Sequence, residues 1–243
     1  MPGLENIILV GASGRMGRCI QALAEEEGLS VQACATRPRL RLPEIQLPQT
    51  SVLMDFSHEA VTHSLLEDFL EKTSPAPPLL VGTTGLSPET VRNLRSYAER
   101  RACLLASNFS LGVALLRACV RLLAAKLPAS FGTEIIEIHH RHKRDRPSGT
   151  AQLLRQELQR ARGERNKPKN SQNQNFSDIG LHSLRLGSFA GEHQVIFADE
   201  GENLRLIHQT ENRQIFARGA LHAARWILGK KPGLYSLEDV FEL

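Results

Sequence analysis

Short apolar runs alternate with amphipathic stretches through the first half of the chain. The apolar runs fall at residues 7–10, 31–35, 52–56, 79–81 and 103–106. Between them, apolar positions recur at helical spacing in residues 18–27, 60–72 and 88–100. Strands that alternate with helices are typical of a parallel sheet with right-handed crossovers and helices on both faces. The pattern therefore predicts an α/β fold with a Rossmann-type doubly wound parallel sheet.

The pattern changes after residue 107. Helical spacing covers residues 111–127, 148–162 and 215–228, and strand patterns cover residues 133–140, 181–189, 193–198 and 204–210, the last three of which we expect to be antiparallel. The polar residues 163–177 predict a flexible loop. We therefore expect two domains. Residues 1–107 and 214–243 form the doubly wound one, and residues 108–213 form an inserted α+β domain.

Composition narrows the class of protein without naming a function. Of 243 residues, 41% are hydrophobic and 23% charged, as in ordinary globular chains, and no apolar run has the length of a membrane span. The N-terminal residues lack the basic region and cleavage site of a signal peptide. Cys19, Cys34, Cys103 and Cys119 show neither CxxC nor metal-ligand spacing, which favours reduced thiols. We therefore expect a cytoplasmic protein without a membrane partner.

A glycine-rich turn follows the first apolar run. Gly11, Gly14 and Gly17 stand between a predicted strand and a predicted helix, the context of a dinucleotide-binding turn. In such turns the glycines permit a tight bend, close approach of the backbone to a pyrophosphate, and close packing of helix on sheet. Amides at the start of the helix then face the phosphates. The GxxGxxG spacing departs from the commoner GxGxxG, and a plain glycine-rich turn is the alternative interpretation.

The end of the second predicted strand bears on the choice of dinucleotide. NAD-binding sites commonly place a carboxylate there, against the ribose hydroxyls. This chain has Arg37 and Arg39 and no carboxylate in that stretch. Arg37 could pair with a 2′-phosphate, which favours NADPH over NADH, whereas a solvated surface arginine is the simpler alternative.

Residues 137–150 concentrate titratable side chains in a predicted strand–loop–helix passage. Strand alternation places His139 and His140 on opposite faces, and Lys143 falls in the loop. The amides of Gly149 and Thr150 stand at the start of a predicted helix, a position where backbone amides can bind an anion. The net charge of +4 is compatible with a nucleic acid, a membrane surface or a small anion.

We interpret residues 137–150 as a catalytic and carboxylate-binding site. A metal site is disfavoured because the histidines lack an acidic partner at ligand spacing, and a nucleic-acid patch because aromatic residues are missing. A solvated basic loop also remains open.

Several segments together resemble the dihydrodipicolinate reductase (4-hydroxy-tetrahydrodipicolinate reductase) family. EIHHRHKRDRPSGTA (Glu137–Ala151) is similar to the family signature E-x-H-H-x-x-K-x-D-x-P-S-G-T-A at every fixed position. GASGRMG, VGTTG, ASNFSLGV and RLGSFAGEH resemble other conserved segments of the family. The resemblance covers almost the whole chain. It implies NAD(P)H-dependent reduction of 4-hydroxy-tetrahydrodipicolinate to tetrahydrodipicolinate, with loss of water, in lysine and diaminopimelate biosynthesis.

The resemblance also assigns roles to individual residues. His139 would be the proton donor or acceptor and Lys143 the proton donor, while His140, Gly149 and Thr150 would bind the dicarboxylate substrate. The implied cofactor-binding residues are Gly11, Ala12, Ser13, Gly14, Arg15, Met16, Arg37, Gly82, Thr83, Thr84, Ala106, Ser107, Asn108 and Phe109. No metal or nucleic acid is implied. The resemblance further implies a homotetramer, assembled through the sheet of the domain at 108–213, which would also bind the substrate.

Other interpretations compete with the reductase. Another NAD(P)-dependent dehydrogenase of similar architecture would explain the glycine turn but not the histidine-rich passage. A non-catalytic cofactor-binding regulator would have no use for Lys143, and a nucleic-acid binder would lose affinity steeply with salt. Phe56 and Ser57 are equally balanced between a cofactor contact and a strand end. His193 and His208 lie on predicted strands, and we expect both to be structural or partly exposed.

Overall fold

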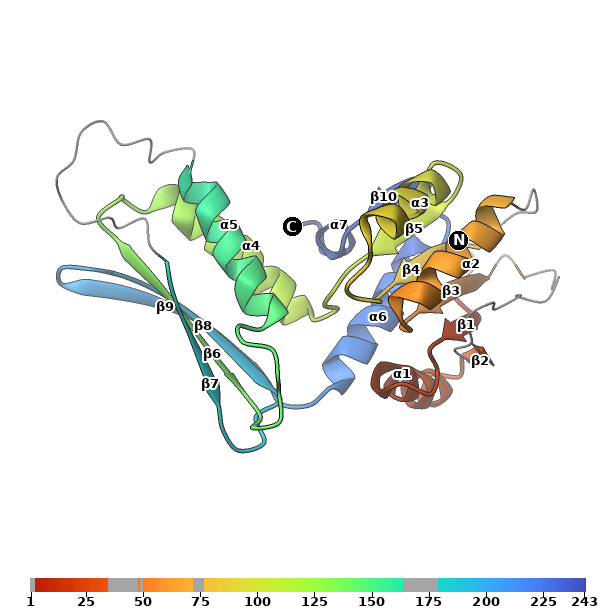
Figure 1. Cartoon of the computed structure of the whole chain (residues 1–243), viewed down its shortest axis with the longest axis horizontal. Helices are drawn as coiled ribbons and strands as arrows, with labels where there is room; N and C mark the ends of the chain where they lie inside the picture. The colour runs from red at the N-terminus through yellow and green to blue at the C-terminus, as the bar shows by residue number, and fades with distance from the viewer. Residues whose placement is uncertain (1–2, 35–47, 49, 72–76, 164–178) are drawn as a thin grey trace. The chain divides into compact units, whose positions relative to one another are not determined.

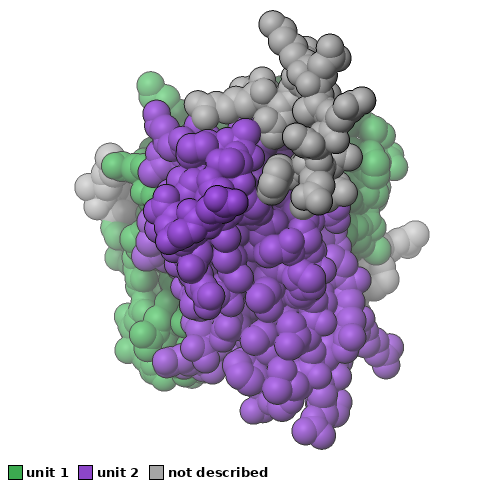
Figure 2. Space-filling model, turned by 90° about the vertical axis from the view of Figure 1, so that its left-hand side faces the viewer, with its two compact units in different colours: residues 1–110, 213–243 green, residues 111–212 purple. Residues whose placement is uncertain are grey.

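The computed structural model describes residues 3–34, 48, 50–71, 77–163 and 179–243. These residues divide into two compact units (Figure 2). Unit 1 comprises Met1–Ser110 and Arg213–Leu243, and unit 2 comprises Leu111–Asn212. No helix within the described ranges is long and apolar enough to cross a membrane.

Unit 1 is a six-stranded parallel sheet with helices on both faces (Figure 1). Its strands are β1 (Asn6–Val10), β2 (Ser30–Cys34), β3 (Ser51–Asp55), β4 (Leu79–Val81), β5 (Ala102–Leu105) and β10 (Gly233–Tyr235). They lie in the order β10-β5-β4-β3-β1-β2, and every pair is parallel. The helices are α1 (Arg15–Glu26), α2 (Glu59–Glu71), α3 (Pro88–Ala98), α6 (Gln214–Ile227) and α7 (Leu237–Phe241). The predicted Rossmann-type α/β fold is confirmed.

The central strands of unit 1 are apolar on both faces because both faces are covered. Ile8 and Val10 of β1 pack in one core with Leu65 of α2 and Leu94 of α3. Alternation sends Ile7 and Leu9 to the opposite face, where α1 and α6 lie against each other. This explains why β1 appears in the sequence as a continuous apolar run rather than an alternating one.

The end of the chain contains more regular structure than the sequence analysis assigned. The last element predicted from the sequence is the helix at 215–228, but β10 follows it, pairs with β5 and extends the sheet. The short helix α7 follows, and Ser236 and Asp239 form a reciprocal capping box at its start. A three-residue strand carries too little periodicity to be recognised in the sequence, and its pairing with β5 defines it.

Unit 2 is a four-stranded sheet with two helices on one face (Figure 1). Its elements are α4 (Leu111–Lys126), β6 (Gly132–His139), α5 (Gly149–Gly163), β7 (Gly180–Arg185), β8 (Gly191–Asp199) and β9 (Glu202–Thr210). The strand order is β7-β6-β8-β9. The core between helices and sheet contains Leu154 and Leu158 of α5 against Ile135, Val195 and Phe197.

One strand of unit 2 pairs differently from our expectation. The pairs β6–β8 and β8–β9 are antiparallel, but β7 pairs with β6 in parallel. The strand at 181–189 therefore runs antiparallel to β8, as expected, but the prediction that it pairs as an antiparallel strand is wrong. The physical reason is the connection: the chain passes from β6 through α5 before it returns as β7, and a helical crossover returns a strand in the parallel direction. The loop predicted at 163–177 lies almost entirely outside the described residues.

Candidate active site

The loops predicted to bind the cofactor meet at one edge of the unit 1 sheet. From β1 the chain moves outward to β2 and then returns to β3 on the other side of β1, which makes the gap between β1 and β3 a topological switch point. The glycine turn follows β1, residues 82–84 follow β4 and residues 106–109 follow β5. Because all six strands are parallel, these loops share the carboxyl edge, where ligands of doubly wound sheets bind. Arg37 lies outside the described residues.

Two glycines of the turn, Gly11 and Gly17, have no room for a side chain. Gly11 has a φ of +84°, and a Cβ there would lie 2.4 Å from the carbonyl oxygen of Phe56. A Cβ on Gly17 would lie 2.2 Å from the carbonyl oxygen of Gly11. Gly14 precedes α1, whose first turn contains no acidic residue, and Ser13, Gly14 and Arg15 are exposed. The first amides of α1 therefore face a backbone cradle that suits a phosphate group.

Phe56 ties the neighbouring loops together. Its ring occupies the space where Gly82 lacks a side chain, since a Cβ on Gly82 would lie 2.2 Å from the ring. The Phe56 and Phe109 ring centroids are 5.3 Å apart. The loops after β3, β4 and β5 are thus packed on one another. Phe56 therefore has a structural role, because its ring holds together the loops at the carboxyl edge of the sheet.

Asp55 is a buried carboxyl group at the end of β3 that the sequence analysis did not single out. It is fully buried, and it accepts hydrogen bonds from the Ser57 amide at 3.0 Å and from the hydroxyls of Ser57 and Thr62, each at 2.5 Å. Burial raises its pKa, although these hydrogen bonds oppose the rise. Asp55 therefore fixes the turn into α2, which positions Phe56 and Ser57.

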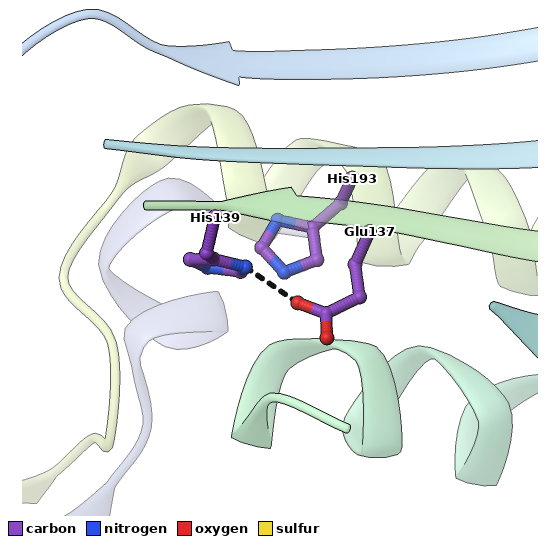
Figure 3. Close-up of side chains that lie close together, drawn as sticks. All are labelled: Glu137, His139 and His193. Atoms are coloured by element: carbon purple, nitrogen blue, oxygen red, sulfur yellow. Dashed lines mark ion pairs between the residues drawn. The ribbon is translucent and has the colours of Figure 1, made fainter. Parts of the chain in front are cut away.

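Unit 2 buries a cluster of Glu137, His139 and His193 (Figure 3). Glu137 and His139 are two residues apart on β6, so strand alternation places both on the face that α4 and α5 cover. His193 comes from β8, where it stands directly opposite Glu137. The three side chains are 0%, 7% and 5% exposed. In Figure 3 the imidazole of His139 points toward the Glu137 carboxylate.

Glu137 is held by positive and polar groups on both oxygens. Its Oε2 lies 2.5 Å from Nδ1 of His139. Its Oε1 accepts from the Arg185 guanidinium at 2.8 Å and from the Ser148 amide at 3.3 Å. Burial opposes ionisation of the carboxyl, but hydrogen bonds from Arg185 and Ser183 and the nearby charges outweigh it and lower the pKa of Glu137 to about 2. Glu137 is therefore a carboxylate at neutral pH.

Both histidines of the cluster are neutral at neutral pH. Burial lowers the pKa of His139, with Lys143 and Arg185 adding to the effect and Glu137 opposing it. Burial and the neighbouring His139 lower the pKa of His193 to about 3. The two rings meet edge to face with centroids 5.2 Å apart. Nε2 of His193 lies 3.0 Å from the hydroxyl of Ser148.

Two contacts in this cluster go beyond what the sequence pattern indicates. The histidines have no acidic partner at metal-ligand spacing, yet Glu137 contacts His139 directly. His193 was expected to be structural or partly exposed, and the antiparallel register of β8 on β6 buries it in the cluster. The spacing of Glu137 and His139 at i and i+2 in a predicted strand was the available signal. No local signal could indicate His193, because its place depends on the pairing of distant strands.

The three side chains also have the donor types of a metal site, with one ligand atom of each within 4.8 Å of the others. The surroundings disfavour that use. Both oxygens of Glu137 are already engaged, and the Arg185 guanidinium neutralises the carboxylate that a cation would need. A carboxylate–imidazole pair accounts for the arrangement better than a metal site does.

The other predicted residues of unit 2 lie in the loop from β6 to α5. Nζ of Lys143 lies 2.9 Å from the Asp145 carboxylate and is partly exposed. Gly149 is the first residue of α5 and is exposed, while His140 and Thr150 are half-buried. The hydroxyl of Ser148 accepts from the amide of Ala151 at 3.2 Å and so caps the helix. This start of α5 offers backbone donors to an anion, and Lys143 lies in the loop that leads to it.

The fold and the two sites define a class of protein. A doubly wound sheet with a backbone cradle at its switch point, in one chain with a unit that buries a carboxylate–imidazole pair, is the organisation of a dinucleotide-dependent oxidoreductase.

Comparison with known proteins specifies the family. Residues 5–109 match the family described as dihydrodipicolinate reductase, N-terminus, and residues 112–241 match dihydrodipicolinate reductase, C-terminus. The chain is 38% identical to 4-hydroxy-tetrahydrodipicolinate reductase of Zymomonas mobilis, covering 97% of this chain and 96% of that one. It is 34% identical to the protein of the same name from Methanoregula boonei, with 99% of each covered. The chain belongs to the dihydrodipicolinate reductase family, whose members are pyridine-nucleotide-dependent oxidoreductases.

A solved structure agrees with this fold. Dipicolinate-bound dihydrodipicolinate reductase from Paenisporosarcina sp. TG-14 superimposes with a TM-score of 0.74, covering 97% of this chain and 99% of that one. The two sequences are 23% identical, so this likeness concerns the fold.

Proposed function

We propose that this chain reduces 4-hydroxy-tetrahydrodipicolinate to tetrahydrodipicolinate with NAD(P)H, a step of lysine and diaminopimelate biosynthesis. The observation that carries the proposal is the buried Glu137–His139 pair beside Lys143, within a complete family signature. In this reaction a hydride is added to the ring and the hydroxyl group leaves as water. The leaving hydroxyl needs a proton, which an acid positioned by the protein supplies.

Unit 1 binds the cofactor at its carboxyl edge. The amides that follow Gly11 contact the pyrophosphate, and Arg15 lies exposed beside them. The assigned residues are Gly11, Ala12, Ser13, Gly14, Arg15, Met16, Gly82, Thr83, Thr84, Ala106, Ser107, Asn108 and Phe109. Glycines 11, 17 and 82 support this assignment, because a Cβ at any of them would clash with neighbouring protein atoms and displace the loops of this edge. Bound NAD(P)H supplies the hydride.

Unit 2 binds the dicarboxylate and manages protons. Gly149 and Thr150 offer the first amides of α5 to one carboxylate, and His140 contacts the substrate. Lys143 is the proton donor: its ammonium supplies the one proton that the reaction consumes, which leaves with the hydroxyl group as water. His139 exchanges a proton with the substrate. The Asp145 carboxylate, 2.9 Å from Nζ, holds Lys143 in the loop.

We further propose that NADPH is preferred, that four copies assemble, and that the protein is cytoplasmic. The preference rests on Arg37, which follows β2 where NAD-binding sites carry a carboxylate. The assembly rests on the sheet face of unit 2 away from α4 and α5, where Ile207 is 59% and Leu184 41% exposed. The location rests on the free thiols of Cys19, Cys103 and Cys119.

The decisive experiment follows nicotinamide absorbance while the purified protein meets substrate made freshly by the preceding synthase, with NADPH and NADH in parallel. Rapid oxidation of the nucleotide supports the reductase. Tight nucleotide binding without turnover would instead indicate a non-catalytic regulator. Arg37→Ala should raise the KM for NADPH and leave that for NADH unchanged; equal effects on both would remove the basis for the preference.

Light scattering tests the assembly separately. A tetramer is expected for the unmodified chain, and Ile207→Asp should dissociate it because a charge would be buried in an apolar interface. A monomer at working concentration for the unmodified chain would contradict the proposal.

A further inference from the structure

The Glu137–His139 pair determines which nitrogen of His139 is available for chemistry. Nδ1 lies 2.5 Å from Oε2 of Glu137, and the carboxylate is ionised, held by Arg185 and the Ser148 amide on its other oxygen. An ionised carboxylate can only accept hydrogen bonds. The proton of the neutral imidazole therefore lies on Nδ1, and Nε2 carries a lone pair.

The ring geometry directs Nε2 away from the carboxylate, and the adjacent backbone leaves it room. Gly191, at the start of β8, lies beside it, and a Cβ on that residue would be 3.1 Å from Nε2. Such a contact is tighter than ordinary packing permits. The glycine thus leaves space beside the nitrogen that faces away from Glu137.

His193 supports the pair without adding charge. The Ser148 hydroxyl accepts from the Ala151 amide, so its own proton is available to Nε2 of His193 at 3.0 Å. His193 is thereby neutral and packs its ring against that of His139. The ionisable groups that act on His139 are then Glu137 on its own strand, Arg185 of β7, Lys143 of the following loop, and His193 of β8.

We infer that Glu137 is a positioning residue that holds His139 as its Nδ1–H tautomer, so that Nε2 is the nitrogen that exchanges a proton with the substrate. The inference rests on the proposed function for the proton exchange, but the tautomer itself does not depend on it. Glu137 touches no reacting atom and acts only through His139. Because histidine tautomers are fixed by the partner of the other nitrogen, loss of the carboxylate should free the ring to change tautomer.

The first test measures the tautomer directly and needs no substrate. In the unmodified protein labelled with nitrogen-15 histidine, the His139 signals, assigned by their loss in His139→Gln, should show a protonated Nδ1 and an unprotonated Nε2 at neutral pH. A protonated Nε2 would overturn the inference. In Glu137→Gln the signals should move toward the Nε2–H form or a mixture, because the amide can donate to Nδ1.

The second test separates positioning from structural support. Glu137→Gln should lower kcat by about tenfold or more, up to the ~10²–10⁴-fold that a positioned acid or base contributes, while KM changes little. In a His139→Gln background the same substitution should cost nothing further, since its effect passes through His139. Multiplying effects would mean that Glu137 acts independently of His139, contrary to the inference.

A pH profile and a matched variant complete the design. Glu137 raises the pKa of His139, so Glu137→Gln should move the limb of the kcat/KM profile that belongs to His139 to lower pH. Glu67→Gln, which alters a more exposed glutamate–histidine pair on α2, should move neither the profile nor the His139 signals. If His139→Gln keeps full activity while the tautomer is as inferred, the proposed role of His139 fails and the tautomer assignment stands.

Discussion

The two candidate sites of this molecule use different chemical groups: mainly backbone in unit 1 and ionisable side chains in unit 2. The carboxyl edge of unit 1 is made of backbone: glycines without room for a Cβ, helix-start amides, and loops packed on the ring of Phe56. The site in unit 2 is made of ionisable side chains, with Glu137 bound to both His139 and Arg185. Even the buried carboxyl of unit 1, Asp55, is surrounded by hydroxyls and an amide.

This difference indicates how each site recognises its ligand and how each can fail. A backbone cradle depends on shape, so it should fail when an atom is added and should respond weakly to pH. A cluster of charged side chains depends on protonation, so it should fail when a charge is removed and should respond strongly to pH. The two kinds of failure should therefore be separable by experiment.

The largest effect should follow removal of the proton donor. Lys143→Ala should lower kcat by about 10²–10⁴-fold, the range for a positioned acid, and leave the Kd for NADPH unchanged. Steady-state kinetics and fluorescence titration of NADPH measure the two quantities. Arg144→Ala removes the same charge from the neighbouring exposed position and should change kcat by no more than about twofold, the scale of a screened surface charge. Equal losses in both variants would mean that only the net charge of the loop matters.

The converse change adds an atom to the glycine turn of unit 1. Gly17→Ala places a Cβ 2.2 Å from the Gly11 carbonyl oxygen, so α1 must shift from the turn. We expect NADPH to bind about tenfold more weakly, equivalent to ~1.4 kcal/mol, and the protein to lose about 1–3 kcal/mol of stability through overpacking. Gly28→Ala, with a φ of +71° but no atom within 4 Å, should cost stability without affecting NADPH. An unchanged Kd for Gly17→Ala would show that the turn does not contact the nucleotide.

The pH dependence of stability should come mainly from unit 2. The pKa of His193 falls from 6.5 to about 3 on folding, so the unfolded chain binds the proton more readily. Stability is then lost as pH falls below 6.5 toward 3, by up to ~1.4 kcal/mol per pH unit for one proton. Urea unfolding at several pH values should show that the free energy of unfolding has a smaller slope against pH for His193→Gln than for the parent chain. Equal slopes in His193→Gln and the parent chain would contradict the assignment.

The smallest effect should come from crowding the imidazole of His139 in unit 2. Gly191→Ala adds a methyl group 3.1 Å from Nε2 of His139 and should lower kcat about fivefold, or ~1 kcal/mol. Gly132→Ala, where the nearest atom is 3.7 Å from the added Cβ, is the matched strand variant and should leave kcat unchanged. A loss shared by both variants would point to sheet distortion rather than to crowding of the imidazole.

Much of this architecture could be predicted because it is encoded locally. The strands and helices of unit 1 lie within a few residues of their predicted positions, since apolar runs and helical spacing are properties of short segments. The strand β10 and the parallel direction of β7 could not be predicted, because both depend on which strand a distant segment joins. Glu137 and His139 are close in the sequence, but their contact depends on which face of β6 the helices α4 and α5 cover.

Short segments of the chain encode the alternation of strands and helices, the glycine turn after the first strand, and the signature that identifies the family. These features depend on residues within one turn, one strand or one loop. Only the tertiary structure placed His193 opposite Glu137, engaged both oxygens of that carboxylate, and buried Asp55 beneath the cofactor edge. The physical reason is that cross-strand register and burial arise from the packing of segments far apart in the chain, and the ionisation of each buried group follows from that packing.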